Sequence, residues 1–135
     1  MSQQRNIASQ QNFAAAVNSG NLDALDDLVT TDCVDHDPAP GQGLGPQGFR
    51  DFFTELRSAF PDLHIEPVHL LATEDEVAFA YSVTGTHSGP LMGHAATGKA
   101  VDVRGVQIGR FTGGKLAERW GSSDQLGILT QLGLA

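Results

Sequence analysis

The sequence is poor in cysteine, in long apolar runs and in basic side chains. Cys33 is the single cysteine among 135 residues, which excludes an intramolecular disulfide and a zinc site built from several cysteines. No apolar run approaches the roughly 18 residues that suggest a membrane-spanning helix. The polar start, MSQQRNIASQQ, lacks the apolar core of a secretion signal. We therefore expect a cytoplasmic protein without a membrane partner, in which Cys33 is a small core side chain.

The few basic residues are dispersed along the chain. Eight Lys and Arg stand against sixteen Asp and Glu, so the formal net charge is −8. No basic residue falls between Arg57 and Lys99, although five acidic residues do. Such a surface repels a phosphate backbone. We expect no nucleic-acid partner.

Apolar periodicity predicts three helices in the first half of the chain. They cover residues 4–18, 21–29 and 46–60, and the chain length fits one domain spanning residues 1–135. The third helix must end before Pro61 and presents a broad aromatic face. That face consists of Phe49, Phe52, Phe53 and Phe60, which we interpret mainly as core, with Phe52 also contacting a substrate.

Alternating residues predict strands in the second half. A hairpin covers residues 63–72 and 77–87, and further strands cover 100–111 and 116–120. The third of these strands has polar and apolar residues on both faces, which suits a curved sheet that meets helices or a cavity on one side and solvent or a second subunit on the other. Ser122-Ser123-Asp124 then forms an N-cap signature before a short apolar helix.

This element order resembles the cone-shaped α+β barrel of nuclear transport factor 2, ketosteroid isomerase and scytalone dehydratase. Specific segments add to it: DHDPAPGQGLGPQGFRDFF, FPDL, GTHSGPLMGHAATGK, VQIGRFTGGKLAERW and DQLGILTQLG. Together they are similar to the SnoaL-like polyketide cyclase family, also called ester cyclases, over nearly the whole chain. The resemblance implies an α+β fold whose cone-shaped, curved antiparallel sheet has about four long strands and a short one. Three N-terminal helices would cover the sheet, and a short C-terminal helix would follow.

The resemblance also implies a function. It indicates an enzyme without cofactor or metal, a homodimer, with a hydrophobic pocket for a small polyketide- or steroid-like molecule. In the characterised cyclases an aspartate at a strand end is general acid and base for an aldol ring closure on a polyketide ester. An apolar cavity raises the pKa of such a carboxylate toward the working pH, so that it can move a carbon-bound proton.

Two positions depart from the family pattern. The family aspartate directly follows the strand tryptophan, whereas Gly121 follows Trp120 here. A supporting histidine of the cyclases matches Gln107, which can hydrogen-bond but cannot act as an acid or base near neutral pH. The chain is therefore a cyclase- or isomerase-like enzyme, a non-catalytic small-molecule-binding member of the fold, or a hydrolase or dehydratase that uses His87 and an ordered water.

The candidate catalytic residues are two histidines and one aspartate. His87 lies by parity on the same strand face as Arg119 and could polarise a carbonyl or take a proton, or it could simply end a strand and bind the next loop. Asp124 is the nearest substitute carboxylate, although capping is the favoured interpretation. His36 could close the mouth of the pocket. Because neighbours in an extended segment point to opposite sides, Asp35-His36-Asp37 is not expected to bind a metal.

The remaining candidates are substrate contacts on the strands. Trp120 lies on the even face, where it could instead pack under the helices or in a subunit interface. The expected contacts are Gln107, Arg119, Gly121, Tyr81, Phe52 and Trp120.

Overall fold

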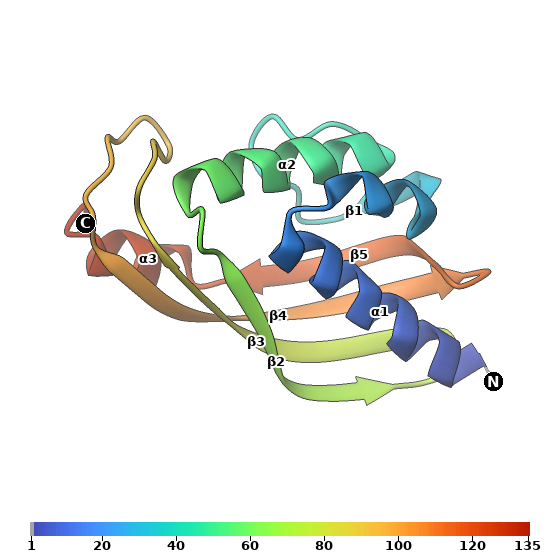
Figure 1. Cartoon of the computed structure of the whole chain (residues 1–135). Coiled ribbons are helices and arrows are strands. Elements are labelled where there is room, and N and C mark those ends of the chain that lie inside the picture. Colours follow the sequence, from blue (N-terminus) through green and yellow to red (C-terminus); the bar gives the residue numbers. More distant parts are fainter. Residues whose placement is uncertain (1) are drawn as a thin grey trace.

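Residues 2–135, which the computed structural model describes, fold into a five-stranded sheet with helices packed on one face (Figure 1). No helix of these residues is long and apolar enough to cross a membrane. In chain order the elements are α1 (Ser2–Ser19), a 3₁₀ helix η1 (Leu22–Asp27), β1 (Val29–Asp35), α2 (Gly45–Ala59), β2 (His64–Ala72), β3 (Glu76–Thr86), β4 (Ala100–Thr112), β5 (Lys115–Ser123) and α3 (Gln125–Gln131).

The strand order is β1-β5-β4-β3-β2, so the long strands follow one another as antiparallel neighbours, as predicted. Two details of the prediction are wrong. The short strand β1 pairs parallel to β5, with Asp35 opposite Arg119. The sheet also stays open, with β1 and β2 at its edges, and does not close into a barrel (Figure 1). The pairing of β1 with β5 brings the residues after β1 beside the end of β5.

Helix α1 covers the sheet with a face that is apolar only toward its C-terminal end. Phe13 and Val17 enter the core, but the buried positions before them are polar. There the Asn6 side chain donates to the Glu74 carbonyl at 2.9 Å, and the Ser9 hydroxyl donates to the Gly114 carbonyl at 2.6 Å. These carbonyls lie in or next to the sheet's turns and need donors because the helix covers them. Apolar periodicity alone does not identify this polar half.

Of the other two helix predictions, one is wrong and one is confirmed. Residues 22–27 form a 3₁₀ helix, and the Asn21 side chain makes no capping bond, so the predicted second α-helix is wrong. Leu25 is still fully buried and anchors this segment in the core. Helix α2 ends as predicted, because Phe60 caps it directly before Pro61. Its aromatic side chains face the sheet and one end of it remains free to line a cavity.

The opposite face of the sheet carries an apolar band that no described helix covers. Two neighbouring rows of residues that pair across the strands form this band. The first row runs from β2 to β5 and consists of Leu71, Ala78, Ile108 and Trp120. The second row consists of Ala80 on β3 and Val106 on β4. Val106 is 56% exposed and Ile108 is 40% exposed. Charged side chains flank the band, among them Arg110 and Glu118.

Candidate functional site

A cavity of about 960 Å³ opens between α2, the loop after β1 and the ends of β4 and β5. One wall is aromatic, because α2 directs Phe49, Phe52 and Phe53 toward it. The opposite wall is polar and comes from the loop after β1, from β4 and β5, and from the start of α3. Its polar and charged members are Asp35, Asp37, Gln42, Arg104, Arg119, Ser122, Ser123, Asp124 and Gln125. The cavity can therefore hold a mostly apolar molecule while polar groups contact one side of it.

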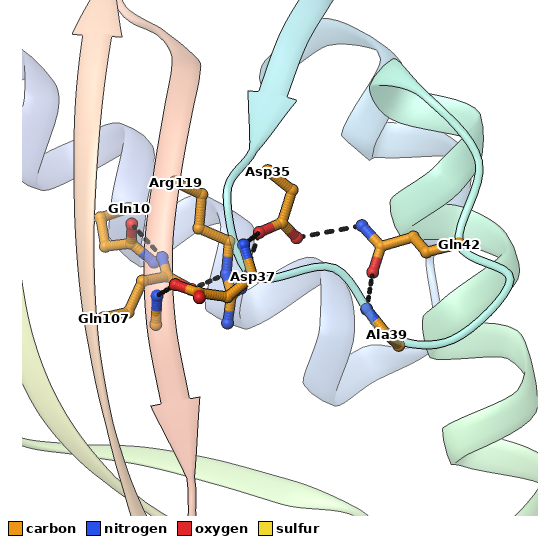
Figure 2. A network of polar contacts seen from close by, with 8 residues as sticks. Gln10, Asp35, Asp37, Ala39, Gln42, Gln107 and Arg119 are labelled. Carbon is orange, nitrogen blue, oxygen red and sulfur yellow. Dashed lines mark hydrogen bonds and ion pairs between the residues drawn. The ribbon is translucent and has the colours of Figure 1, made fainter.

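The centre of the polar wall is an ion pair between Arg119 and Asp35 (Figure 2). The Arg119 Nη1 donates to Asp35 Oδ1 at 3.0 Å, and both side chains are largely buried, with 18% and 8% exposed. The other carboxylate oxygen of Asp35 accepts from Gln42 Nε2 at 3.0 Å. Gln42 in turn accepts from the Ala39 backbone N–H and so holds the loop in place. The aspartate is thus fully engaged in positioning the arginine and the loop.

Gln107 holds the arginine from the other side. Its Oε1 accepts from Arg119 Nε at 2.8 Å, and its Nε2 lies 3.5 Å from Gln10 Oε1 on helix α1. Both glutamines are buried. Gln107 therefore orients a guanidinium, and its amide cannot titrate near neutral pH.

The absence of a side chain at Gly121 leaves space for this guanidinium. A Cβ atom at position 121 would lie 2.7 Å from Arg119 Nη2, which is closer than real side chains approach. The Gly121 backbone N–H donates to Asp37 Oδ2 at 2.8 Å, so the Asp37 carboxylate lies directly beside Gly121. The backbone N–H of Asp37 donates to Asp35 Oδ1 at 3.0 Å, which fixes the turn that carries the carboxylate.

Tyr81 lies behind the polar wall. Its hydroxyl lies over Gly105, where a Cβ atom would be only 2.4 Å away. Burial raises the pKa of the Tyr81 phenol, and the positive charge of nearby Arg119 acts in the opposite direction. Tyr81 supports the arginine side of the cavity without lining it.

The aromatic wall is linked to the core. Phe52 and Phe53 meet edge to face with ring centroids 5.0 Å apart, and Phe53 and Phe49 each pack against Phe13 of α1, at 5.9 and 5.8 Å. Phe49 is buried, whereas Phe52 and Phe53 are both partly exposed, and of these two only Phe53 packs against the buried core. Phe52 is therefore the ring most available to a ligand.

His87 lies apart from the cavity. It is fully buried, 5.6 Å from the Phe60 ring, and its Nδ1 accepts from the Thr97 backbone N–H at 3.1 Å. Its Nε2 has no partner among the described residues, and no lining position of the cavity belongs to it. His87 follows the end of β3. Thr86 pairs with Ala100 and Arg119 pairs with Gly109, so His87 and Arg119 lie far apart along the sheet.

His36 and Trp120 lie on the outer face. Their rings stack with centroids 4.7 Å apart and planes 9° apart, and His36 Nε2 lies 2.8 Å from Glu118 Oε2. Neither residue lines the cavity. Trp120 thus occupies the even face, as its parity predicts.

Asp124 caps helix α3, as predicted: its Oδ1 accepts from the Gly127 N–H at 2.8 Å. It also lines the cavity rim. The two serines before it belong to β5 and not to the cap, because the strand continues to Ser123.

Sequence reasoning missed the role of the Asp35-His36-Asp37 segment. The alternation in an extended chain places Asp35 and Asp37 on one side and His36 on the other, and the structure has this arrangement. This alternation can be read from the sequence, but the sequence does not show that β1 pairs with β5. Within residues 2–135 no three His, Cys, Asp or Glu side chains gather as they would around a metal ion.

The comparisons with known proteins agree with this architecture. A family model for SnoaL-like polyketide cyclases matches residues 8–132. The chain belongs to this family. It is similar to the aklanonic acid methyl ester cyclase DnrD of Streptomyces peucetius, at 27% identity over 87% of this chain and 83% of that protein.

Solved structures of the family share the fold. TsrD from Streptomyces laurentii is 26% identical and superposes with a TM-score of 0.89, covering 98% of this chain and 97% of its own. AclR from Streptomyces galilaeus, suggested to be a hydroxylase, is 28% identical with a TM-score of 0.86 and 98% coverage of both chains. The family scaffold therefore carries proteins to which different chemistries are ascribed.

Proposed function

We propose that the protein closes a ring in a small, largely apolar polyketide-type ester bound in this cavity, by acid–base chemistry without a cofactor. Membership of the cyclase family and the similarity to an aklanonic acid methyl ester cyclase support the reaction class. The observation that carries the proposal is the Asp37 carboxylate on the Gly121 N–H. It supplies a carboxylate from the neighbouring loop at the position where the family aspartate is replaced by glycine.

The proposed reaction moves one proton and forms one bond. The free oxygen of Asp37 takes a proton from the carbon next to a carbonyl group. The resulting carbanion attacks a second carbonyl carbon, and a carbon–carbon bond forms. The π electrons of that carbonyl move to its oxygen, which takes the proton back and becomes a hydroxyl. No electron acceptor is needed, and one carboxylate serves as acid and base.

The substrate would lie between the two walls of the cavity. Phe52 would stack on or against an unsaturated ring. Arg119 and the hydroxyl group of Ser123 would hold its oxygen atoms. A buried, oriented guanidinium makes stronger hydrogen bonds to such oxygens than a neutral donor does.

Oligomerisation is a second part of the proposal. We propose a homodimer that forms through the outer apolar band of the sheet. Exposed Val106 and Ile108 lie beside Trp120, with charges on both sides of the band. This pattern of an apolar centre and a polar rim is typical of a subunit interface. We also propose that the protein works in the cytoplasm, where its buried Cys33 stays a free thiol.

Conversion of aklanonic acid methyl ester tests the reaction. We expect the natural protein to form cyclised product and Asp37→Asn to lose at least about 100-fold in rate, the usual range for a general base. The amide oxygen that this substitution introduces can still accept from the Gly121 N–H, so the loop should stay in place. Asp124→Asn, which keeps a capping oxygen, is the matched control and should retain most of the activity. Product from Asp37→Asn at the natural rate would reject this base, and tight binding without turnover by the natural protein would indicate a non-catalytic member.

A further inference from the structure

We infer that Arg119 is the oxyanion-binding residue of this cavity, and that its ligands are aromatic-sized molecules that carry an enolate, phenolate or carboxylate oxygen. The inference deepens the proposed function, since it names a residue and a substrate class for the same site. It does not depend on ring closure, because binding alone can be measured.

The guanidinium is held in one orientation, with its Nη2 nitrogen on the cavity side. Its Nε donates to Gln107 and its Nη1 donates to Asp35. Nη2 lies over Gly121, on the lining of the cavity. The Tyr81 hydroxyl makes a side-chain hydrogen bond with the guanidinium, and since Nη2 carries two N–H groups, at least one of them stays available to a ligand. A guanidinium has five N–H donors in a rigid fork, so fixing two nitrogens aims the third. An anionic oxygen in the cavity would meet this free edge without a side-chain rearrangement.

The negative charge of Asp35 does not abolish the ability of Arg119 to bind an anionic oxygen. Its two oxygens accept from three donors, which are Arg119, Gln42 and the Asp37 N–H. The negative charge is therefore spread over several hydrogen bonds. When Asp37 takes a proton in the proposed reaction, the negative charge passes to the substrate oxygen, so the total charge in the cavity stays the same. Arg119 would stabilise that oxygen, where charge develops.

In this arrangement the glycine at position 121 has a role in ligand binding. Any side chain at position 121 would displace Nη2, since even a Cβ would lie 2.7 Å from it. An aspartate there would in addition place its carboxylate against the guanidinium and occupy it. We infer that glycine keeps the arginine open to ligand, whereas in a merely defective cyclase an aspartate at this position would restore function.

The ligand class follows from both walls together. Phe52 and Phe53 offer apolar ring surfaces opposite the arginine. An aromatic carboxylate would stack on the rings while its carboxylate meets Nη2. Binding of 2-naphthoate, compared with the neutral 2-naphthamide of the same shape, therefore isolates the contribution of the charge.

Calorimetric or NMR titration of the natural protein should show 2-naphthoate binding at least about tenfold more tightly than 2-naphthamide, as expected for a charge-assisted hydrogen bond. Arg119→Gln should reduce this preference to less than about threefold, and Arg119→Lys should lie between. Gly121→Asp should lose the preference as well. Because Arg119→Gln leaves Asp35 without its cation, the double variant Arg119→Gln/Asp35→Asn serves as a second probe and should behave in the same way.

Equal affinity of the natural protein for 2-naphthoate and 2-naphthamide would overturn the inference. So would a folded Arg119→Gln variant or double variant that still binds 2-naphthoate more tightly. A Gly121→Asp variant that gains ring closure and keeps the preference would also contradict it. If the preference holds while the natural protein forms no product, the ring-closure proposal fails and this inference stands. If product forms but the protein shows no preference for 2-naphthoate, the ring-closure proposal stands and this inference fails.

Discussion

The Asp37 carboxylate accepts a hydrogen bond from the Gly121 backbone N–H at 2.8 Å, across the junction between the end of β1 and β5. A strand residue that brings no acid of its own thereby holds one from another segment. Parallel pairing of β1 with β5 makes this possible, because the chain leaving β1 runs on beside the later residues of β5. The proposed chemistry therefore depends on a contact between residues 84 positions apart in sequence.

Two neighbouring phenylalanines should separate ligand binding from stability. Phe52→Ala removes a partly exposed ring and should weaken binding of 2-naphthoate while the urea unfolding midpoint changes little. Phe49→Ala removes a buried ring that packs on Phe13 and should cost about 3–5 kcal/mol of unfolding free energy. Equal loss of stability in both variants would show that Phe52 is a core residue and not a wall of the site.

Cys33 should be inert in the folded protein. Burial raises the pKa of its thiol to about 11, and the nearby carboxylates of Asp35 and Asp32 act in the same direction. With its side chain 5% exposed, almost no accessible thiolate exists at pH 8. A disulfide reagent such as DTNB should react only in denaturant, or at the rate of unfolding in buffer. Rapid stoichiometric labelling in buffer would contradict the core placement.

Glu118 should contribute to stability above acidic pH. Hydrogen bonds from His36 and Arg110 hold the pKa of its carboxyl below the ordinary value of 4.5. A lowered folded-state pKa stabilises the fold above the unfolded-state pKa, and this stability disappears as pH falls through the folded-state value. Glu118→Gln should therefore flatten the acidic limb of a urea-midpoint profile as the pH falls through and below the ordinary value of 4.5. Asp62→Asn is a useful comparison, since the pKa of Asp62 is lowered separately by its bonds to Thr86. An unchanged limb in Glu118→Gln would refute the assignment.

The dimer proposal concerns the outer apolar band. In sedimentation at micromolar concentration the natural protein should behave as a species of about twice 14.3 kDa. Ile108→Asp places a charge in the band and should yield monomer. Leu44→Asp alters an equally apolar but more exposed residue on the loop before α2, at 88% exposure, and should leave the dimer intact. A natural protein found only as monomer would reject the proposal.

Much of the fold could be predicted from the sequence because its signals are local. Pro61 ends α2, alternation marks the four long strands, and Asp124 caps α3. The errors concern weak or distant signals. Residues 22–27 are too short and too acidic to distinguish an α-helix from a 3₁₀ turn, and the buried polar residues of α1 depend on which sheet turns it crosses.

The site was predictable only in part. Strand parity correctly linked Arg119, Gly121 and Gln107, since alternation is a local property. It could not tell how far along the sheet His87 lies from them. The contributions of Asp35 and Asp37 depend on β1 joining β5, a pairing between distant segments for which the residues give no pattern. Asp37 was therefore missed because it comes from the loop after β1, far from β5 in the sequence.

Proton exchange at the substrate's acidic carbon tests the central claim most directly, because it reports the base without requiring the ring to close. In D₂O, the natural protein should catalyse deuterium incorporation next to the carbonyl of aklanonic acid methyl ester, measured by NMR or mass spectrometry. Asp37→Asn should reduce that rate by at least about 100-fold, while Asp124→Asn should leave most of it. Exchange no faster than in buffer with the natural protein, or undiminished exchange with Asp37→Asn, would contradict acid–base catalysis by the carboxylate held on Gly121.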